Sequence, residues 1–185
     1  GPISDHWNGR KFYNFCPDFW NREVDKKSAG EVLQFDLGFD FFFKLFFHHW
    51  KKRPLPDGPA YPAERIFGRQ IVVTFVNHST VLIQTEGLNI LTDPVWSHRT
   101  SPVPFLGPKR YVPPGVELSD LPKIDLVLLS HNHYDHMDVK ALRVIAGRDH
   151  PAIFTTLGNS AYLSSRGISG SVDLDWGQSR KFSDD

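Results

Sequence analysis

The sequence predicts a mixed α/β domain, and three features of the chain indicate it. Residues 70–77, 80–85 and 88–92 form β-branched or apolar runs that short polar turns separate, which is typical of hairpin-connected strands. Residues 124–130 (IDLVLLS) form a nearly continuous apolar run, typical of a strand buried on both faces. A helix pattern and another strand pattern follow this run. A hairpin part followed by a β-α-β part predicts one mixed sheet with flanking helices.

The elements after the apolar run follow from caps and β-branched residues. A helix is expected over residues 138–145, with Asp138 as its N-cap. Strands are expected over residues 152–156 and 171–175, with a short helix over residues 160–166 between them.

A long connection over residues 94–123 is rich in proline and glycine. Loops of this length in compact domains are often functional. We therefore expect an ordered loop that contributes to a site.

The first 69 residues differ in composition from the remainder. Residues 1–30 mix aromatic and polar side chains without a period, residues 39–50 repeat aromatics at spacings of three and four, and residues 54–69 are rich in proline and glycine. We expect residues 1–69 to be an arm, an aromatic helix and a linker packed on a domain of residues 70–185. An alternative places the aromatic helix on a lipid surface. The candidate lipid contacts are Phe42, Phe43, Phe46 and Phe47.

Composition excludes several classes of protein. The chain has 21 basic and 21 acidic side chains, so its net charge gives no argument for nucleic acid. Cys16 is the single cysteine, which excludes a disulfide within the chain and fits a reducing compartment. No apolar run approaches the roughly 18 residues of a membrane-spanning helix. We expect a cytoplasmic or peripheral membrane protein, with a periplasmic location left open.

A metal-binding loop is expected directly after the apolar run, in His131-Asn132-His133-Tyr134-Asp135-His136. His131 and His133 are two residues apart, so in extended backbone both imidazoles can reach one ion. Asp135 and His136 follow within three residues and can reach a second ion. Imidazole and carboxylate without thiolate favour zinc, with manganese or iron as alternatives. Two ions about 3.5–4 Å apart can share a water and present hydroxide at neutral pH.

The motif His131-x-His133-x-Asp135-His136 resembles the signature of the metallo-β-lactamase superfamily. Three flanking blocks narrow the resemblance to the branch of N-acyl-phosphatidylethanolamine-hydrolysing phospholipases D and its bacterial relatives. These blocks are NHSTVLI at residues 77–83, LTDPVWS at residues 91–97 and GPKR at residues 107–110. The resemblance runs from about Trp7 to Trp176 and implies the αββα metallo-β-lactamase fold.

The resemblance also implies roles for single residues. His131 and His133 would bind one metal, and Asp135 and His136 the other, with Asp135 also helping to protonate a leaving group. Asp93 would support the metal loop, although an Asp-Pro turn alone would also explain it. His78 resembles a residue near the pocket, although a core or loop histidine would explain it equally, and His48, His49, His98 and His150 match no ligand position of the family. Asn132, from its amide chemistry, is expected to hydrogen-bond behind the ligands.

The family completes its site with another histidine, a bridging aspartate and a last histidine, and none of them follows His136 at a matching position before Asp185. We therefore expect the N-terminal half of the fold, with two protein ligands for each of two metals. Such a half would expose an apolar face and associate with a C-terminal half or a second copy.

The implied activity is hydrolysis of a phospholipid phosphodiester, with peripheral membrane contact, by metal-activated hydroxide. A lactonase, a phosphoesterase on a small soluble phosphodiester, and a non-catalytic half-domain are the alternatives.

Overall fold

The computed structural model describes residues 53–55, 58–103 and 105–182. Apart from residues 175–178, which belong to a second compact unit, these residues belong to one compact unit that carries the sheet. The expected arm, the aromatic helix and the four candidate lipid-contact phenylalanines lie outside the described residues, so their contacts stay predictions. In the part of the chain that the structure describes, no helix combines the length and the apolar character needed to cross a membrane.

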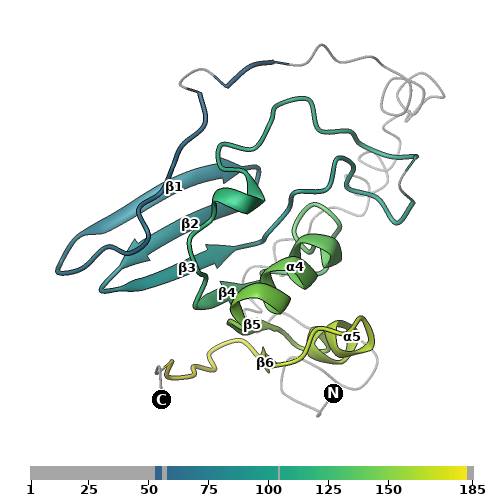
Figure 1. The fold of residues 1–185 in the computed structure, drawn as a ribbon. Helices are drawn as coiled ribbons and strands as arrows, with labels where there is room; N and C mark the ends of the chain where they lie inside the picture. The colour runs from purple at the N-terminus through teal and green to yellow at the C-terminus, as the bar shows by residue number, and fades with distance from the viewer. Residues whose placement is uncertain (1–52, 56–57, 104, 183–185) are drawn as a thin grey trace, which may run out of the picture. The chain divides into compact units, whose positions relative to one another are not determined.

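The described part is a six-stranded sheet whose strands lie in the order of the sequence, as Figure 1 shows. The strands are β1 (Ile71–Asn77), β2 (Thr80–Thr85), β3 (Leu88–Thr92), β4 (Leu126–Leu128), β5 (Ala152–Thr156) and β6 (Ser171–Leu174). The helices are the short 3-10 helix η1 (Leu118–Asp120), α4 (Val139–Asp149) and α5 (Asn159–Ser165). The prediction of a mixed sheet with flanking helices is confirmed.

Strands β1, β2 and β3 pair antiparallel through two tight turns. His78, in the β1–β2 turn, has φ +39, and Glu86, in the β2–β3 turn, has φ +48. The left-handed residue allows each turn to be short, and a short turn fixes the register of its hairpin. The segment before β1 packs along these strands, since Gln84 Nε2 donates to Ala63 O over 2.7 Å and Gly87 N donates to Ile66 O over 2.7 Å.

Strands β3, β4, β5 and β6 pair in parallel, so this half of the sheet follows the predicted β-α-β order. Asp138 caps α4, as predicted, but the helix runs on to Asp149 and ends where His150 adopts φ 52. The expected strand over residues 124–130 is shorter, covering Leu126–Leu128. The expectation that it is buried on both faces is wrong at Leu128, which is 37% exposed.

The core lies between the sheet and helices α4 and α5. Apolar side chains from alternate positions of β2, β3, β4 and β5 meet one face of each helix, as binary patterning requires. These buried residues include Leu82, Leu91, Val127, Leu142, Ile145, Ile153 and Leu163. Their burial fixes the carboxyl ends of β3, β4 and β5 side by side, which is where the candidate site lies.

Strand β1 leaves an apolar stripe in solvent. Ile71, Val73 and Phe75 alternate along it and are 68%, 62% and 66% exposed. This stripe agrees with the expectation of an exposed apolar face, and association with a second copy or a C-terminal half stays a prediction.

An ion pair joins the segment before β1 to the start of β4. Arg65 binds Asp125 through two nitrogens, and the Asp125 carboxylate also accepts from Asn89 N over 2.8 Å. Burial by itself would raise the pKa of Asp125, but Arg65 and the Asn89 N–H outweigh burial and hold the pKa below its usual value. The carboxylate therefore stabilises the fold above the unfolded-state pKa of about 3.9 and stops doing so as pH falls through the lower folded-state value.

We expect Asp125→Asn to lower the free energy of unfolding by about 1–3 kcal/mol at pH 7, since it weakens charge-assisted hydrogen bonds to a side chain that is 11% exposed. The deficit should shrink below about pH 4, where the wild-type carboxylate also loses its charge. Urea unfolding at pH 7 and at pH 3 measures both. Asp120→Asn, at an exposed aspartate, is the control. A deficit independent of pH would contradict the account.

Candidate metal centre

The candidate metal loop joins the carboxyl end of β4 to the N-terminus of α4. The last hydrogen bond between this segment and the sheet runs from Leu129 N to Phe154 O. The loop then makes a tight turn, in which His136 N and Met137 N both donate to His133 O, over 3.0 and 2.7 Å. Met137, only 3% exposed, anchors the turn in the core. The loop thus lies at the strand ends, the usual place for sites in sheets with parallel strands.

Asp93 stands behind the loop at the end of β3. Its carboxylate is 6% exposed and accepts from Ser130 N and Ser130 Oγ, both over 2.8 Å. His136 Nδ1 lies 2.8 Å from Asp93 Oδ2. Since a carboxylate can only accept, Nδ1 of His136 carries the proton and Nε2 is left for a metal. This contact is the arrangement expected for an aspartate that supports the metal loop, and an Asp-Pro turn alone would not need it.

Asp135 and His136 meet His78, which projects from the β1–β2 turn. His78 Nε2 donates to Asp135 Oδ2 over 3.0 Å, and Asp135 Oδ2 lies 3.7 Å from His136 Nε2. Among the described residues, these three offer a set of ligand atoms within 4.8 Å of one another. Ser79 Oγ also donates to Asp135 O over 3.3 Å, so the turn holds the loop from two points. The sequence left His78 undecided between pocket and plain loop, and the structure places it at the site.

His131 and His133 lie on the same cluster of rings. The ring centroids of His131 and His133 are 4.5 Å apart, and those of His131 and His136 are 4.1 Å apart. The four predicted ligands therefore lie together, with His78 beside them. Asn132 is exposed and has no hydrogen bond to the residues that the structure describes, so nothing in the fold supports its expected role behind the ligands.

Electrostatics prepare two of the groups to bind a metal. Burial lowers the pKa of His131, and the nearby His136 and His133 lower it further. Burial would raise the pKa of Asp135, but its own backbone N–H, His136 and His78 together hold that pKa below its usual value. At neutral pH His131 is therefore neutral and Asp135 is charged, and these are the forms that coordinate metals. The donor set of imidazoles and one carboxylate fits zinc.

Sequence reasoning missed the serine that links these groups. Ser130 Oγ lies 2.9 Å from His131 Nδ1 and donates to Asp93 over 2.8 Å. Asp138 was predicted only as a helix cap, yet its carboxylate also accepts from Trp96 N and Ser97 N over 3.0 and 2.6 Å. The position of Ser130 directly before His131 was the available sequence signal for the serine contact. The contacts of Asp138 with Trp96 and Ser97 depend on the path of the long loop, which no local sequence pattern predicts.

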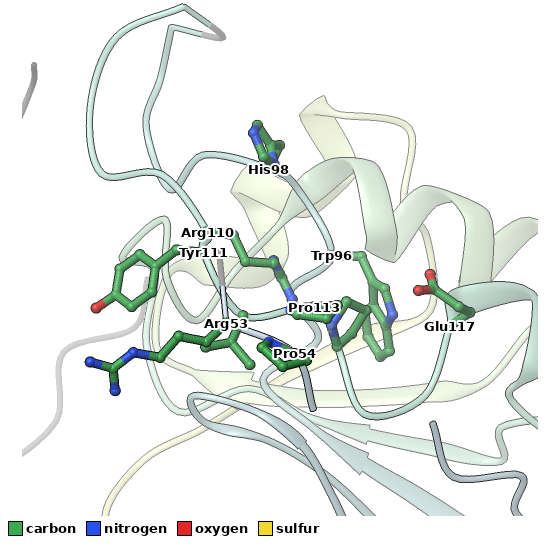
Figure 2. Close-up of a pocket in the computed structure, with 10 residues that line it drawn as sticks. Arg53, Pro54, Trp96, His98, Arg110, Tyr111, Pro113 and Glu117 are labelled. Carbon is green, nitrogen blue, oxygen red and sulfur yellow. The ribbon is translucent and has the colours of Figure 1, made fainter. Parts of the chain in front are cut away.

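Two of the cavities along the long loop share Arg110 and Tyr111 in their linings. One of about 420 Å³ reaches the candidate site, because His78 and Asp135 line it together with Lys109, Arg110 and Tyr111. The other, of about 460 Å³, is shown in Figure 2 and contains none of the metal-loop residues. There the Arg110 side chain extends toward Trp96, while Tyr111 and Arg53 point the other way. We place the chemistry at the first cavity, since only it adjoins candidate ligands.

The comparisons with known proteins agree with this geometry. The beta-lactamase superfamily domain matches residues 88–184, which is more than half of the chain and includes the metal loop. The chain belongs to this superfamily.

Two relatives support the phospholipase-like branch recognised in the sequence. The N-acyl-phosphatidylethanolamine-hydrolyzing phospholipase D 1 of Caenorhabditis elegans is 40% identical, over 60% of this chain and 33% of the worm protein. The mitochondrial enzyme of that name from Saccharomyces cerevisiae is 36% identical, over 56% of this chain and 22% of the yeast protein.

An uncharacterized Mycobacterium tuberculosis protein is 42% identical over 60% of this chain and 30% of its own length. The matched part thus spans a third or less of these curated relatives. Among solved structures, a metallo hydrolase of Ignicoccus hospitalis has a TM-score of 0.45 at 22% identity, over 60% of this chain and 42% of that protein. An isothiocyanate hydrolase from Delia radicum gut bacteria has a TM-score of 0.46 at 26% identity, over 56% and 41%.

We expect His78→Ala to weaken zinc binding by about 10–100-fold, the usual effect of removing a side chain that positions a ligand. The reason is that Asp135 loses the donor that fixes its carboxylate. Competition with a chromogenic chelator measures the affinity. His150→Ala is the control, since His150 lies beyond the far end of α4. Equal affinity in wild type and His78→Ala would show that the contact is incidental.

Proposed function

We propose that the protein is a zinc-dependent phosphodiesterase that hydrolyses N-acyl-phosphatidylethanolamine-type phospholipids to phosphatidic acid and the head-group alcohol. The observation that carries the proposal is the contact of Asp93 with His136, together with the His78–Asp135 contact. These contacts hold the loop from behind, which supports a metal loop over a polar surface turn. The choice of substrate follows the worm and yeast enzymes, whose names state it for those proteins.

His131 and His133 would hold one zinc ion, and Asp135 and His136 the second. When bound, two such ions supply an acidified water and positive charge beside the phosphoryl oxygens. Asp93 keeps Nε2 of His136 directed at the metal by accepting from Nδ1. Asp135, with its lowered pKa, starts as a charged carboxylate and can accept a proton and pass it to the leaving alcohol. His78 keeps that carboxylate in place through its 3.0 Å hydrogen bond.

Lys109 gives the cavity at the site a positive wall, and Asp135 is the one carboxylate among the described residues that line it. The guanidinium of Arg110, also in the lining, is turned inward and donates to Val95 O over 2.8 Å. A phosphodiester anion is therefore favoured over a neutral lactone at this wall, since a cationic lining concentrates anions. This charge separates the proposed function from a lactonase on the same loop.

The test compares three substrates with the purified, zinc-loaded protein in its longest encoded form. These are an N-acyl-phosphatidylethanolamine in mixed micelles, the soluble diester bis(p-nitrophenyl) phosphate, and an acyl-homoserine lactone. We expect phosphatidic acid from the lipid by mass spectrometry, loss of this product with a chelator, and recovery with zinc. Turnover of the lactone alone would replace this proposal by a lactonase, and turnover of the soluble diester alone by a general phosphoesterase. Recovery of activity with manganese or iron instead of zinc would change the metal in the proposal and leave the proposed reaction as it is.

A further inference from the structure

The long connection between β3 and β4 contains a hairpin-like projection that the proposed chemistry does not use. It covers residues 98–110 and is called the 98–110 hairpin here; residue 104 is not described. Arg99 and Lys109 form an antiparallel bridge, and Arg110 N donates to His98 O over 2.8 Å. Thr100 N donates to Pro108 O over 3.2 Å. In Figure 1 this connection leaves the carboxyl end of β3 and extends away from the sheet.

Two contacts join the two sides of the 98–110 hairpin at Gly107. Gly107 has φ +100, and a Cβ there would lie 2.6 Å from Ser101 Cβ, so the two strands of the hairpin touch. Arg99 Nη1 donates to Gly107 O over 2.5 Å across the same point. Contacts of this kind reduce the entropy that a projecting loop loses when it binds.

The two residues before Gly107 present apolar side chains to solvent. Phe105 is 78% exposed and Leu106 is 42% exposed. A single exposed apolar residue is ordinary, but two adjacent ones on a projecting loop form a candidate contact surface.

Positive charge lies along and beside the 98–110 hairpin. Residues 94–116 include Arg99, Lys109 and Arg110 and contain no aspartate or glutamate. Beside the hairpin lies a cavity of about 540 Å³ whose lining includes the four cations Arg99, Lys140, Arg143 and Arg166. Among the described residues that line it, Asp138 is the one carboxylate, and it already accepts from the backbone N–H groups of Trp96, Ser97 and Lys140. Exposed apolar side chains on a hairpin with cations beside it are complementary to an anionic lipid surface, where the acyl chains lie beneath the phosphates.

We propose that the 98–110 hairpin docks the protein on anionic phospholipid membranes, with Phe105 and Leu106 inserted among the acyl chains and Arg99, Lys109, Lys140 and Arg143 at the phosphates. The inference rests on the proposed function for the choice of lipid over protein. The 420 Å³ cavity connects the hairpin to the site, since Thr100, Pro108 and Lys109 of the hairpin line it together with His78 and Asp135. A docked hairpin places the mouth of that cavity next to the lipid that the site is proposed to cleave.

The test is co-sedimentation with phosphatidylcholine vesicles, with and without phosphatidylserine, with no substrate present. We expect binding only to the phosphatidylserine vesicles, and we expect Phe105→Ser/Leu106→Ser to lower the partition coefficient at least about 10-fold, since burial of two such side chains is worth more than one decade. Lys109→Glu should lower the partition coefficient by about 5–10-fold and should make the partition coefficient depend less on salt concentration. Phe67→Ser is the matched control, because Phe67 is 74% exposed and lies against Gly87, at the opposite end of β2 from His78.

Equal binding of wild type and Phe105→Ser/Leu106→Ser would overturn the inference, and so would equal binding to neutral and anionic vesicles. In either case the apolar end would be left for a protein partner. Because sedimentation needs no turnover, the two proposals fail separately. Vesicle binding without cleavage of a diester would support this inference and contradict the proposed function. Cleavage of the diester without vesicle binding would support the proposed function and contradict this inference.

Discussion

His133→Ala is expected to reduce kcat/KM for metal-dependent hydrolysis at least about 100-fold in the longest encoded form of the protein. Side chains that only position ligands cost about 10–100-fold when they are removed, and His133 is proposed to be a ligand itself. His133 is exposed, and its described ring contact is with His131, at 4.5 Å between centroids. The loss should therefore come from the metal rather than from the fold. Initial rates with bis(p-nitrophenyl) phosphate and with the lipid measure it.

The neighbouring Asn132→Ala gives the matched control. Asn132 is also exposed and makes no hydrogen bond within the described part of the chain, so its removal perturbs the loop equally little. We expect it to keep most of the activity, with thermal unfolding of both variants within the error of wild type. Full activity in His133→Ala, or an equal loss in Asn132→Ala, would mean that the reacting centre lies elsewhere.

Most of the sheet could be predicted because its signals are local. The runs at residues 80–85, 88–92 and 152–156 are β-branched or apolar between turn residues, and the structure reproduces their bounds. The run at residues 124–130 was overestimated because an apolar sequence does not reveal where ladder pairing stops. Only Leu126–Leu128 align with both β3 and β5. The end of α4 was missed because His150, not glycine, adopts the left-handed C-cap.

The candidate site was predictable in its ligands and not in its supports. Three histidines and an aspartate within six residues carry their chemistry in one short stretch. His78 lies 57 positions before Asp135, and only the pairing of β1 with β2 brings that turn to the loop. The 98–110 hairpin has no pattern of period two or 3.6, so its shape follows from backbone bonds that a sequence does not display.

Asp93→Ala is expected to destabilise the fold by about 2–4 kcal/mol and to weaken zinc binding at least about 10-fold. The nearly buried Asp93 carboxylate accepts three hydrogen bonds, from Ser130 N, Ser130 Oγ and His136, and alanine leaves these donors without their acceptor. Each unsatisfied donor at a buried position costs about 1–3 kcal/mol, and partial access of water reduces the sum. The melting temperature should fall by about 5–15 °C for a chain of this size.

Asp93→Asn separates the two effects, because asparagine keeps the volume and one acceptor oxygen but cannot accept from all three donors. About half of the lost unfolding free energy should be recovered, since the asparagine oxygen can still accept from the Ser130 N–H. Zinc affinity should stay low, because an amide no longer supplies the negative charge that directs the proton of His136 to Nδ1. If zinc affinity recovered together with stability, the link from Asp93 to the metal would be only mechanical. If it stayed low in a stable variant, the charge of Asp93 would be what prepares His136 as a ligand.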